Sequence, residues 1–308
     1  MSPLHIEEIS LSILNATLSR YPDTASSALA DLDTLRYETI PRTLEKMKGE
    51  KSLLKADIEK LVEWKLKHGT YRPALMNLVK SNPADVFKST TQEAFASHRD
   101  DGDVMKALKI LTKLRGIGPA TASLLLSVYQ PDQVPFFSDE LFRWTHWDSP
   151  GKSGWLRIIK YNVTEYKEIL ASVEGLRKRL GVKAVDAEKV AYVLGKGNVE
   201  LDLGVDTEED AEVVVGEKIE ENKERDRRVE VAAAGAAAAM DSARTASESG
   251  RKRKAAGEKK SRQEKGEAAG DDLSHGEPAK RTTKQGVKRK AQETKPPAEG
   301  TRKSTRRK

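Results

Sequence analysis

Apolar residues recur at three- and four-residue steps through most of the first two hundred positions, which is the period of an amphipathic α-helix. The clearest predicted helix runs from Leu53 to His68 and ends at Gly69, and a second long one ends at Leu180, just before Gly181. No stretch alternates apolar and polar residues for long enough to predict a strand. The pattern therefore predicts an all-α domain. Shorter helices are predicted over 5–21, 26–36, 71–80, 103–115 and 120–129, with two brief ones around residues 86 and 95.

The composition changes after the predicted helices end. All 4 Trp, 7 Tyr and 5 Phe precede residue 193, and the last aromatic is Tyr192. Without aromatics, the remaining residues cannot build an ordinary core. We therefore predict a helical domain over residues 1–198 and a long disordered tail over 199–308.

The predicted tail is acidic first and basic afterwards. Residues 201–230 carry 5 Lys/Arg and 12 Asp/Glu, whereas 241–308 carry 21 and 10. The excess of positive charge at the end favours a partner with phosphates. Three basic clusters there are of the nuclear-import kind: Arg251, Lys252, Arg253 and Lys254; Lys288, Arg289 and Lys290; and 303–308. They predict a nuclear location and an import receptor as partner, the alternative being a merely solubilising tail.

Several absences narrow the class of protein. The chain has no cysteine, which excludes disulfides, thiolate metal sites and a cysteine nucleophile. Its N-terminus lacks the basic and apolar segments of a secretory signal. The longest wholly apolar run, 231–240, is too short to span a bilayer. We expect no membrane association, no metal and no cofactor.

The segment from Leu114 to Ala122, LRGIGPATA, predicts a tight turn between two helices. Gly116 and Gly118 tolerate backbone angles that other residues resist, and Pro119 suits the first position of a helix. Bare backbone at the glycines lets amide groups and a helix N-terminus approach a phosphate. The alternative is a simple turn between two core helices. The candidate DNA-binding residues are Gly116, Ile117, Gly118, Ala120 and Thr121.

One carboxylate follows this turn at the start of a later helix. Ser138 is a good N-cap, which places Asp139 in the first helical turn, where the helix dipole favours the ionised form. A rigidly held carboxylate can stabilise positive charge that develops on a sugar. The alternative is an ordinary helix-starting aspartate paired with Arg143.

The LRGIGPATA segment resembles the helix-hairpin-helix signature of the endonuclease-III-type DNA glycosylase superfamily. Members of that superfamily place an aspartate at the head of a later helix, and the 21-residue offset from Gly118 to Asp139 is similar to their spacing. The resemblance implies a DNA glycosylase-like fold in which Asp139 is catalytic and the amides at Gly116 and Gly118 hold a DNA phosphate. Members that also cut the strand carry a lysine where this chain has Ala120, so the resemblance implies base removal only. Members with an iron–sulfur cluster bind it through four cysteines, which this chain lacks.

A second run, Leu61 to Pro73, resembles the Amun-like nuclear proteins, which are assigned to the same fold. It places basic side chains beside aromatic ones. One interpretation is a pocket wall that stacks on an extruded base or grips phosphate. The other is that the tryptophan is core and the charges are solvated. The candidate pocket residues are Trp64, Lys65, Tyr71 and Arg72.

Together these patterns predict a nuclear, monomeric protein that binds double-stranded DNA and removes a damaged base in base excision repair, with Asp139 as its catalytic residue. The first alternative is a catalytically inactive DNA- or chromatin-binding module on the same fold. The second is a helical adaptor for a protein partner. The sequence leaves open whether the chain is an enzyme.

Overall fold

The computed structural model describes residues 2–151, 154–202, 207 and 209–228. Within these residues the secondary structure is helical and contains no strand, which confirms the prediction of an all-α domain. None of the described helices is both long and apolar enough to cross a membrane.

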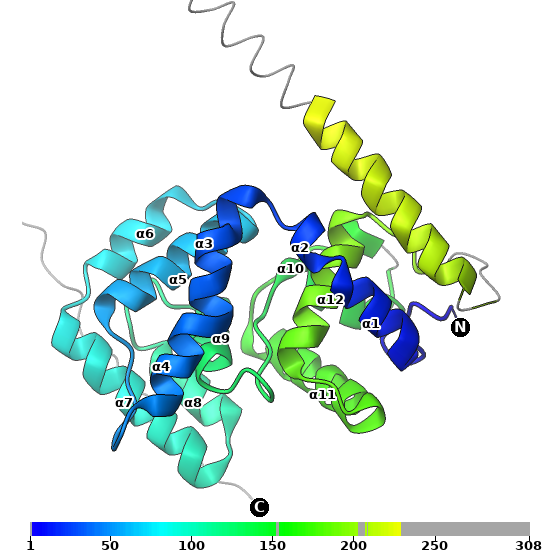
Figure 1. Cartoon of the computed structure of the whole chain (residues 1–308). Helices are drawn as coiled ribbons and strands as arrows, with labels where there is room; N and C mark the ends of the chain where they lie inside the picture. The colour runs from blue at the N-terminus through cyan, green and yellow to red at the C-terminus, as the bar shows by residue number, and fades with distance from the viewer. Residues whose placement is uncertain (1, 152–153, 203–206, 208, 229–308) are drawn as a thin grey trace, which may run out of the picture. The chain divides into compact units, whose positions relative to one another are not determined.

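The helices form two packed groups that share a core (Figure 1). The chain starts in one group, builds the other, and returns through a loop over residues 130–138. The first group holds α3 (Ala30–Thr34), α4 (Ile40–Lys46), α5 (Lys55–His68), α6 (Pro73–Lys80), α7 (Ala84–Asp101), α8 (Val104–Leu111) and α9 (Pro119–Tyr129). The second holds α1 (Leu11–Ser19), α2 (Tyr21–Thr24), α10 (Asp139–Thr145), α11 (Val163–Leu180) and α12 (Ala184–Lys196). Short turns of other helix types are η1 (Ser27–Leu29), η2 (Leu35–Thr39) and η3 (Gly154–Leu156).

Local chemistry moves several boundaries away from the predicted ones. The first helix starts at Leu11 rather than at residue 5, because the Ser10 hydroxyl caps it by accepting from the Ile13 amide at 3.3 Å. The two brief helices expected around residues 86 and 95 are one continuous helix, α7. That helix ends at Gly102, which adopts the left-handed conformation with φ 67°.

The helical structure continues beyond residue 198, where the sequence predicted that the tail begins. Residues 209–228 form another helix. Its Ala211, Val215 and Ile219 recur every four residues and are buried, and the Asn222 side-chain amide donates to the Gly197 carbonyl. Aliphatic residues at helical spacing can bury one face of an acidic segment without any aromatic. The predicted domain boundary is therefore too early. The basic clusters at 251–254, 288–290 and 303–308 lie outside the described residues.

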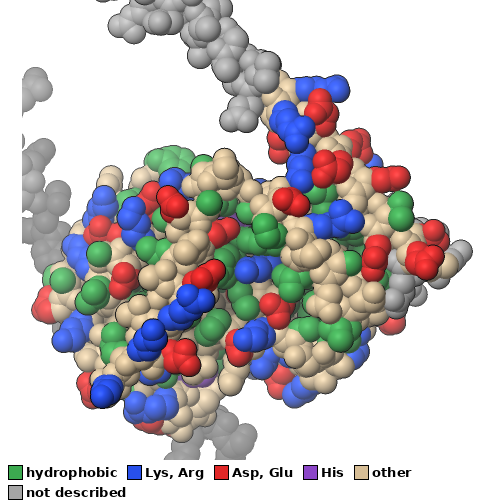
Figure 2. All heavy atoms as spheres, viewed as in Figure 1, with side chains coloured by type: hydrophobic (Ala, Val, Ile, Leu, Met, Phe, Trp, Pro, Cys, Tyr) green, Lys and Arg blue, Asp and Glu red, His purple; other side chains and the backbone are tan. Residues whose placement is uncertain are grey.

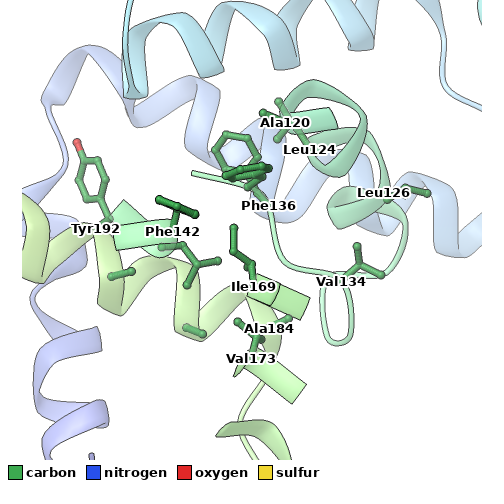
Figure 3. Close-up of a cluster of buried hydrophobic side chains, with 14 of the residues drawn as sticks. Ala120, Leu124, Leu126, Val134, Phe136, Phe142, Ile169, Val173, Ala184 and Tyr192 are labelled. Atoms are coloured by element: carbon green, nitrogen blue, oxygen red, sulfur yellow. The ribbon is translucent and has the colours of Figure 1, made fainter. Parts of the chain in front are cut away.

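A buried ion pair joins the two groups. Arg36 in η2 donates to Glu188 on α12 at 2.5 Å, and both side chains are almost fully buried. The other oxygen of Glu188 accepts the Phe136 amide at 2.5 Å. The guanidinium carbon also lies 4.0 Å from the ring centre of Trp64. Figure 3 shows Val134 and Phe136, from the 130–138 loop, among apolar side chains of the helices on either side of that loop.

We predict that Glu188→Gln lowers the free energy of unfolding by about 3 kcal/mol, because it leaves the Arg36 charge buried without a counter-charge. Urea denaturation measures this. Glu174→Gln is the matched control: Glu174 pairs with Lys178 on the surface of α11, and such pairs contribute less than about 1 kcal/mol. Equal effects of the two substitutions would contradict the prediction.

Candidate functional site

The turn between α8 and α9 requires a glycine at position 116. Gly116 has φ 78°, and an added Cβ would lie 2.9 Å from the Leu78 Cβ of α6. The buried Asn82 side chain holds the same turn: its amide donates to the Arg115 carbonyl and its oxygen accepts from the Arg115 amide, both at 2.9 Å. The fold therefore accounts for Gly116 without any ligand.

Gly118 differs, because neither packing nor backbone strain requires a glycine there. Its φ is −89°, it is exposed, and no atom lies within 4 Å of the position that a Cβ would occupy. It is the N-cap of α9, and no side chain caps this helix. The amides of Ala120 and Thr121 have no hydrogen-bond acceptor among the described residues. An open helix start with free amides is a favourable position for an anion.

Two other predicted DNA-binding residues, Ile117 and Thr121, have side chains that DNA cannot reach. The Ile117 side chain is buried and its amide donates to the Leu114 carbonyl at 3.1 Å, so it anchors the turn. Thr121 is also buried, which leaves its backbone as the only candidate contact. Arg115 is exposed and forms no ion pair with a described residue, whereas Lys113 pairs with Glu93 at 3.0 Å.

Asp139 lies at the first position of α10, as the sequence predicted. The Ser138 hydroxyl caps the helix by accepting from the Leu141 amide at 3.0 Å. The predicted partner Arg143 instead donates to the Arg157 carbonyl at 3.2 Å. The two carboxylate oxygens of Asp139 accept from other groups, as described next.

Tyr161 and Thr70 hold the Asp139 carboxylate from opposite groups of helices. The Tyr161 hydroxyl donates at 2.9 Å and the Thr70 hydroxyl at 3.2 Å. Burial, with the charge of Asp139 adding to it, raises the pKa of Tyr161 to about 12, so the phenol stays protonated and donates. Arg72 lies over the phenol ring, 4.8 Å from its centre.

Tyr161 has φ 55°, a left-handed conformation that is unfavourable for a bulky side chain. This strained position faces the candidate catalytic carboxylate. Tyr161 could not be predicted from the sequence, because no residue pattern near it predicts left-handed backbone or contact with Asp139.

The side chains of Asp139, Tyr161, Thr70 and Arg72 line a narrow pocket between the two groups of helices. It encloses about 280 Å³, part of which is open to solvent, and its sheltered interior is about the size that one water molecule needs. Side chains that bear a carboxylate and side chains that bear a basic group both reach the pocket. The lining residues are Lys65, His68, Gly69, Thr70, Arg72, Phe136, Ser138, Asp139, Glu140 and Tyr161.

The structure separates the four candidate pocket residues. Lys65 and Arg72 line the pocket. Trp64 is fully buried in the core and its indole donates to Asp33 at 2.6 Å, while Tyr71 is 69% exposed and lies outside the pocket. Consecutive helical residues point about 100° apart, which explains why Trp64 and Lys65 face different surroundings.

Two further titratable residues, His68 and Glu140, line the pocket. His68 stacks on Trp64 and Tyr192, with ring centres 4.2 and 4.1 Å apart. Burial, aided by the positive charges of Arg36, Lys196 and Lys65, lowers the pKa of His68 well below its ordinary value, so the ring is neutral at pH 7. Burial also raises the pKa of Glu140, whose nearest described cation is Lys196 at 4.0 Å.

Charge over the domain is nearly balanced. Residues 1–200 carry 29 Lys/Arg and 26 Asp/Glu. Figure 2 shows both signs interspersed over the viewed face. Attraction of a phosphate backbone to this domain would thus depend on a few local groups rather than on a broad positive field.

One cluster among the described residues has the composition of a metal site: His5, Asp148 and Asp202. Both ring nitrogens of His5 already contact the carboxylates, at 2.7 Å for Asp148 and 3.2 Å for Asp202. The cluster ties the N-terminal segment to residues 148 and 202, and this tie explains the arrangement without a metal.

No protein-family model matches the sequence, and neither a curated protein nor a solved structure matches the chain.

We predict that His68 makes the protein less stable in mild acid. Its pKa is lower in the folded chain than the unfolded value of about 6.5, so the unfolded chain binds more protons and stability falls as pH decreases through 6.5. Between pH 7.5 and 5.5 this single group removes on the order of 1 kcal/mol. Urea denaturation at both pH values measures the decrease in the free energy of unfolding. This decrease should be smaller by that amount in His68→Gln than in the parent protein, because the variant keeps all the other titratable groups. Identical pH dependence of the two proteins would refute the assignment.

Proposed function

We propose that the chain is a DNA-binding protein of the monofunctional DNA glycosylase type, in which Asp139 takes part in removal of a damaged base. The observation that carries the proposal is the position of Asp139: a carboxylate at a helix start, held by two hydroxyl groups, in a pocket formed by both groups of helices. The open N-terminus of α9 supplies a second element, a place for a phosphate.

In this proposal, the α9 N-terminus holds a phosphate of double-stranded DNA while a damaged nucleotide is extruded toward the pocket. The negative charge of Asp139 stabilises the positive charge that develops on the sugar as the base leaves, and a carboxylate oxygen orients the attacking water. Tyr161 and Thr70 fix the carboxylate, so that its geometry does not depend on a flexible side chain. Ala120 supplies no amine at the α9 start.

The narrowness of the pocket favours a second candidate. A nucleobase does not fit into a space the size of a water molecule, so Tyr161, Thr70 or Arg72 must move before a base can enter. If the pocket stays closed, the same fold is a catalytically inactive module that binds DNA or chromatin. In both cases the basic clusters of the sequence support a nuclear location and an import receptor as partner.

DNA binding is tested by two alanine substitutions two residues apart. We predict that Gly118→Ala keeps the stability within about 1 kcal/mol of the parent but weakens binding to duplex DNA about tenfold, since a methyl group would obstruct the approach to the α9 amides. Gly116→Ala should instead lower the stability by more than about 1 kcal/mol, because of its positive φ and the contact with Leu78. Urea denaturation and fluorescence anisotropy measure the two effects. Unchanged DNA affinity of Gly118→Ala would argue against this interface.

Base removal is tested with the full chain in excess over a panel of duplexes, each with one damaged or mismatched base. We predict release from at least one duplex, and a loss of about a hundredfold or more in Asp139→Asn, which removes the charge that stabilises the sugar cation. Asp132→Asn is the control, since Asp132 is exposed and pairs with Lys183 outside the pocket.

Release that persists in Asp139→Asn would rule out the role of this carboxylate. No release from any duplex that is nevertheless bound would favour the inactive module.

A further inference from the structure

A second cavity is lined by side chains of residues 21–38 and by Lys189 of α12. It encloses about 730 Å³, part of which is open to solvent. Small apolar side chains, among them Ala25 and Ala30, form part of its wall. Unlike the narrow pocket that Asp139 lines, this cavity has room for a small organic group beside the lysine amine.

The Lys189 amine rests on aromatic rings and has no counter-ion. Its nitrogen lies 4.1 Å from the ring centre of Tyr37 and 5.1 Å from that of Tyr21. It forms no hydrogen bond or ion pair with a described residue, and it is not among the fully buried atoms that lack a partner, so it keeps access to the cavity. Lys183, at the start of the same helix, differs because it pairs with Asp132 at 3.0 Å.

Neither carboxylate of the cavity pairs with this lysine amine. Asp33 accepts from the Trp64 indole at 2.6 Å and from the Tyr21 hydroxyl at 3.1 Å. Glu38 pairs with Arg42 at 3.2 Å. Both acidic side chains thus have other partners, and the ammonium form of the lysine lies in a partly buried position without a direct counter-charge.

A second cation lies on the Tyr37 ring, where the guanidinium carbon of Arg36 is 4.5 Å from the ring centre. Burial lowers the pKa of Lys189, and the charge of Arg36 adds to this effect. The surroundings therefore favour the neutral amine, which is the form that attacks a carbonyl carbon. Three carboxylates act in the opposite direction without reversing the shift: Asp33, Glu188 and Asp186.

We propose that Lys189 is a modification site that is acylated by small acyl thioesters. Its neutral nitrogen attacks the thioester carbonyl carbon, a carbon–nitrogen bond forms, and the carbon–sulfur bond breaks. The leaving sulfur takes the proton that the nitrogen loses. Amine plus thioester thus gives amide plus thiol, with no oxidant or reductant.

The product suits the cavity better than the ammonium does. Acylation removes the charge of a lysine, which ends its repulsion with Arg36 across the Tyr37 ring. The acyl group enters a space with apolar walls and the faces of two tyrosines. The reaction needs neither DNA nor Asp139, so it does not depend on the proposed function.

Lys65 separates the effect of the cavity from that of the neutral amine. Burial lowers the pKa of Lys65 as well, and its amine also forms no ion pair with a described residue. Its pocket, however, has a sheltered interior of about the size that one water molecule needs. An acyl thioester should therefore reach Lys189 but not Lys65.

The test treats the folded full chain with acetyl-coenzyme A and follows the acetylated fraction of each lysine by peptide mass spectrometry. We expect Lys189 to react about fivefold faster or more than both Lys183 and Lys65, because only Lys189 combines a favoured neutral amine with an open cavity. In concentrated urea the three lysines should react at similar rates, since the cavity and the ion pairs are lost.

Two substitutions of one residue test the aromatic support. Tyr37→Leu removes the ring under the amine and should bring the Lys189 rate down to that of Lys183, whereas Tyr37→Phe keeps the ring and should react as the parent does. Thermal unfolding shows whether each variant is folded, and the comparison of lysines in the parent stands without them.

Three outcomes would overturn the proposal. The first is an Lys189 rate in the folded chain no higher than that of Lys183. The second is an equally fast reaction of Lys65, which would make the cavity irrelevant. The third is a preference for Lys189 that persists in urea, which would assign it to the local sequence rather than to the fold. Base release from damaged duplexes is measured separately, so failure of either proposal leaves the other standing.

Discussion

The candidate site depends on the buried ion pair between Arg36 and Glu188. Burial acts to lower the pKa of Arg36, but the charge and hydrogen bond of Glu188, together with Tyr37 and Tyr21, outweigh burial and raise that pKa, so the guanidinium stays charged inside the protein. Two charges removed from water are tolerated when they are paired, and here one guanidinium nitrogen of Arg36 forms the pair while its Nε and Nη1 are buried without a hydrogen-bond partner among the described residues. Because one partner belongs to each group of helices, the pair requires that the groups meet in one arrangement. The Glu188 carboxylate also fixes the loop between them through the Phe136 amide.

That loop determines where Asp139 lies. Besides the bond to Phe136, the Phe137 amide donates to the Ser123 hydroxyl at 2.9 Å, and the Tyr166 hydroxyl donates to the Pro135 carbonyl at 2.9 Å. Three successive residues of the loop are thus bound to α9, α11 and α12 immediately before Ser138 caps α10. A carboxylate on a helix that starts from such a loop is held more rigidly than one on a free loop. The contacts that stabilise the core at this loop therefore also fix the geometry of the pocket.

The features that the sequence predicted are those that depend on a few neighbouring residues. The Ser138 cap, the turn at Gly116 and the start of α9 at Pro119 each require only local backbone chemistry. The partners of Asp139 could not be predicted, since Thr70 and Tyr161 are 69 and 22 residues away and meet only in the folded chain. The positions of Glu188 and Lys65 in the folded chain could not be predicted for the same reason. The packing of the helix over 209–228 was not predicted for another reason: its composition indicates a tail, whereas its four-residue apolar spacing allows packing.

Tyr161 connects the closure of the pocket with the way it could open. Its hydrogen bond to Asp139 and that of Thr70 both go to a carboxylate, and such bonds contribute about 1.5–3 kcal/mol each. Both would be lost if the side chains moved aside for a ligand. Its left-handed backbone, however, costs about 1–3 kcal/mol in the closed form, and this strain is released if the segment before α11 relaxes. By these magnitudes the released strain offsets only part of the two hydrogen bonds, so the closed pocket is lower in free energy than one with Tyr161 displaced. A ligand that opens the pocket must therefore give Asp139 new partners that replace the two hydroxyl groups.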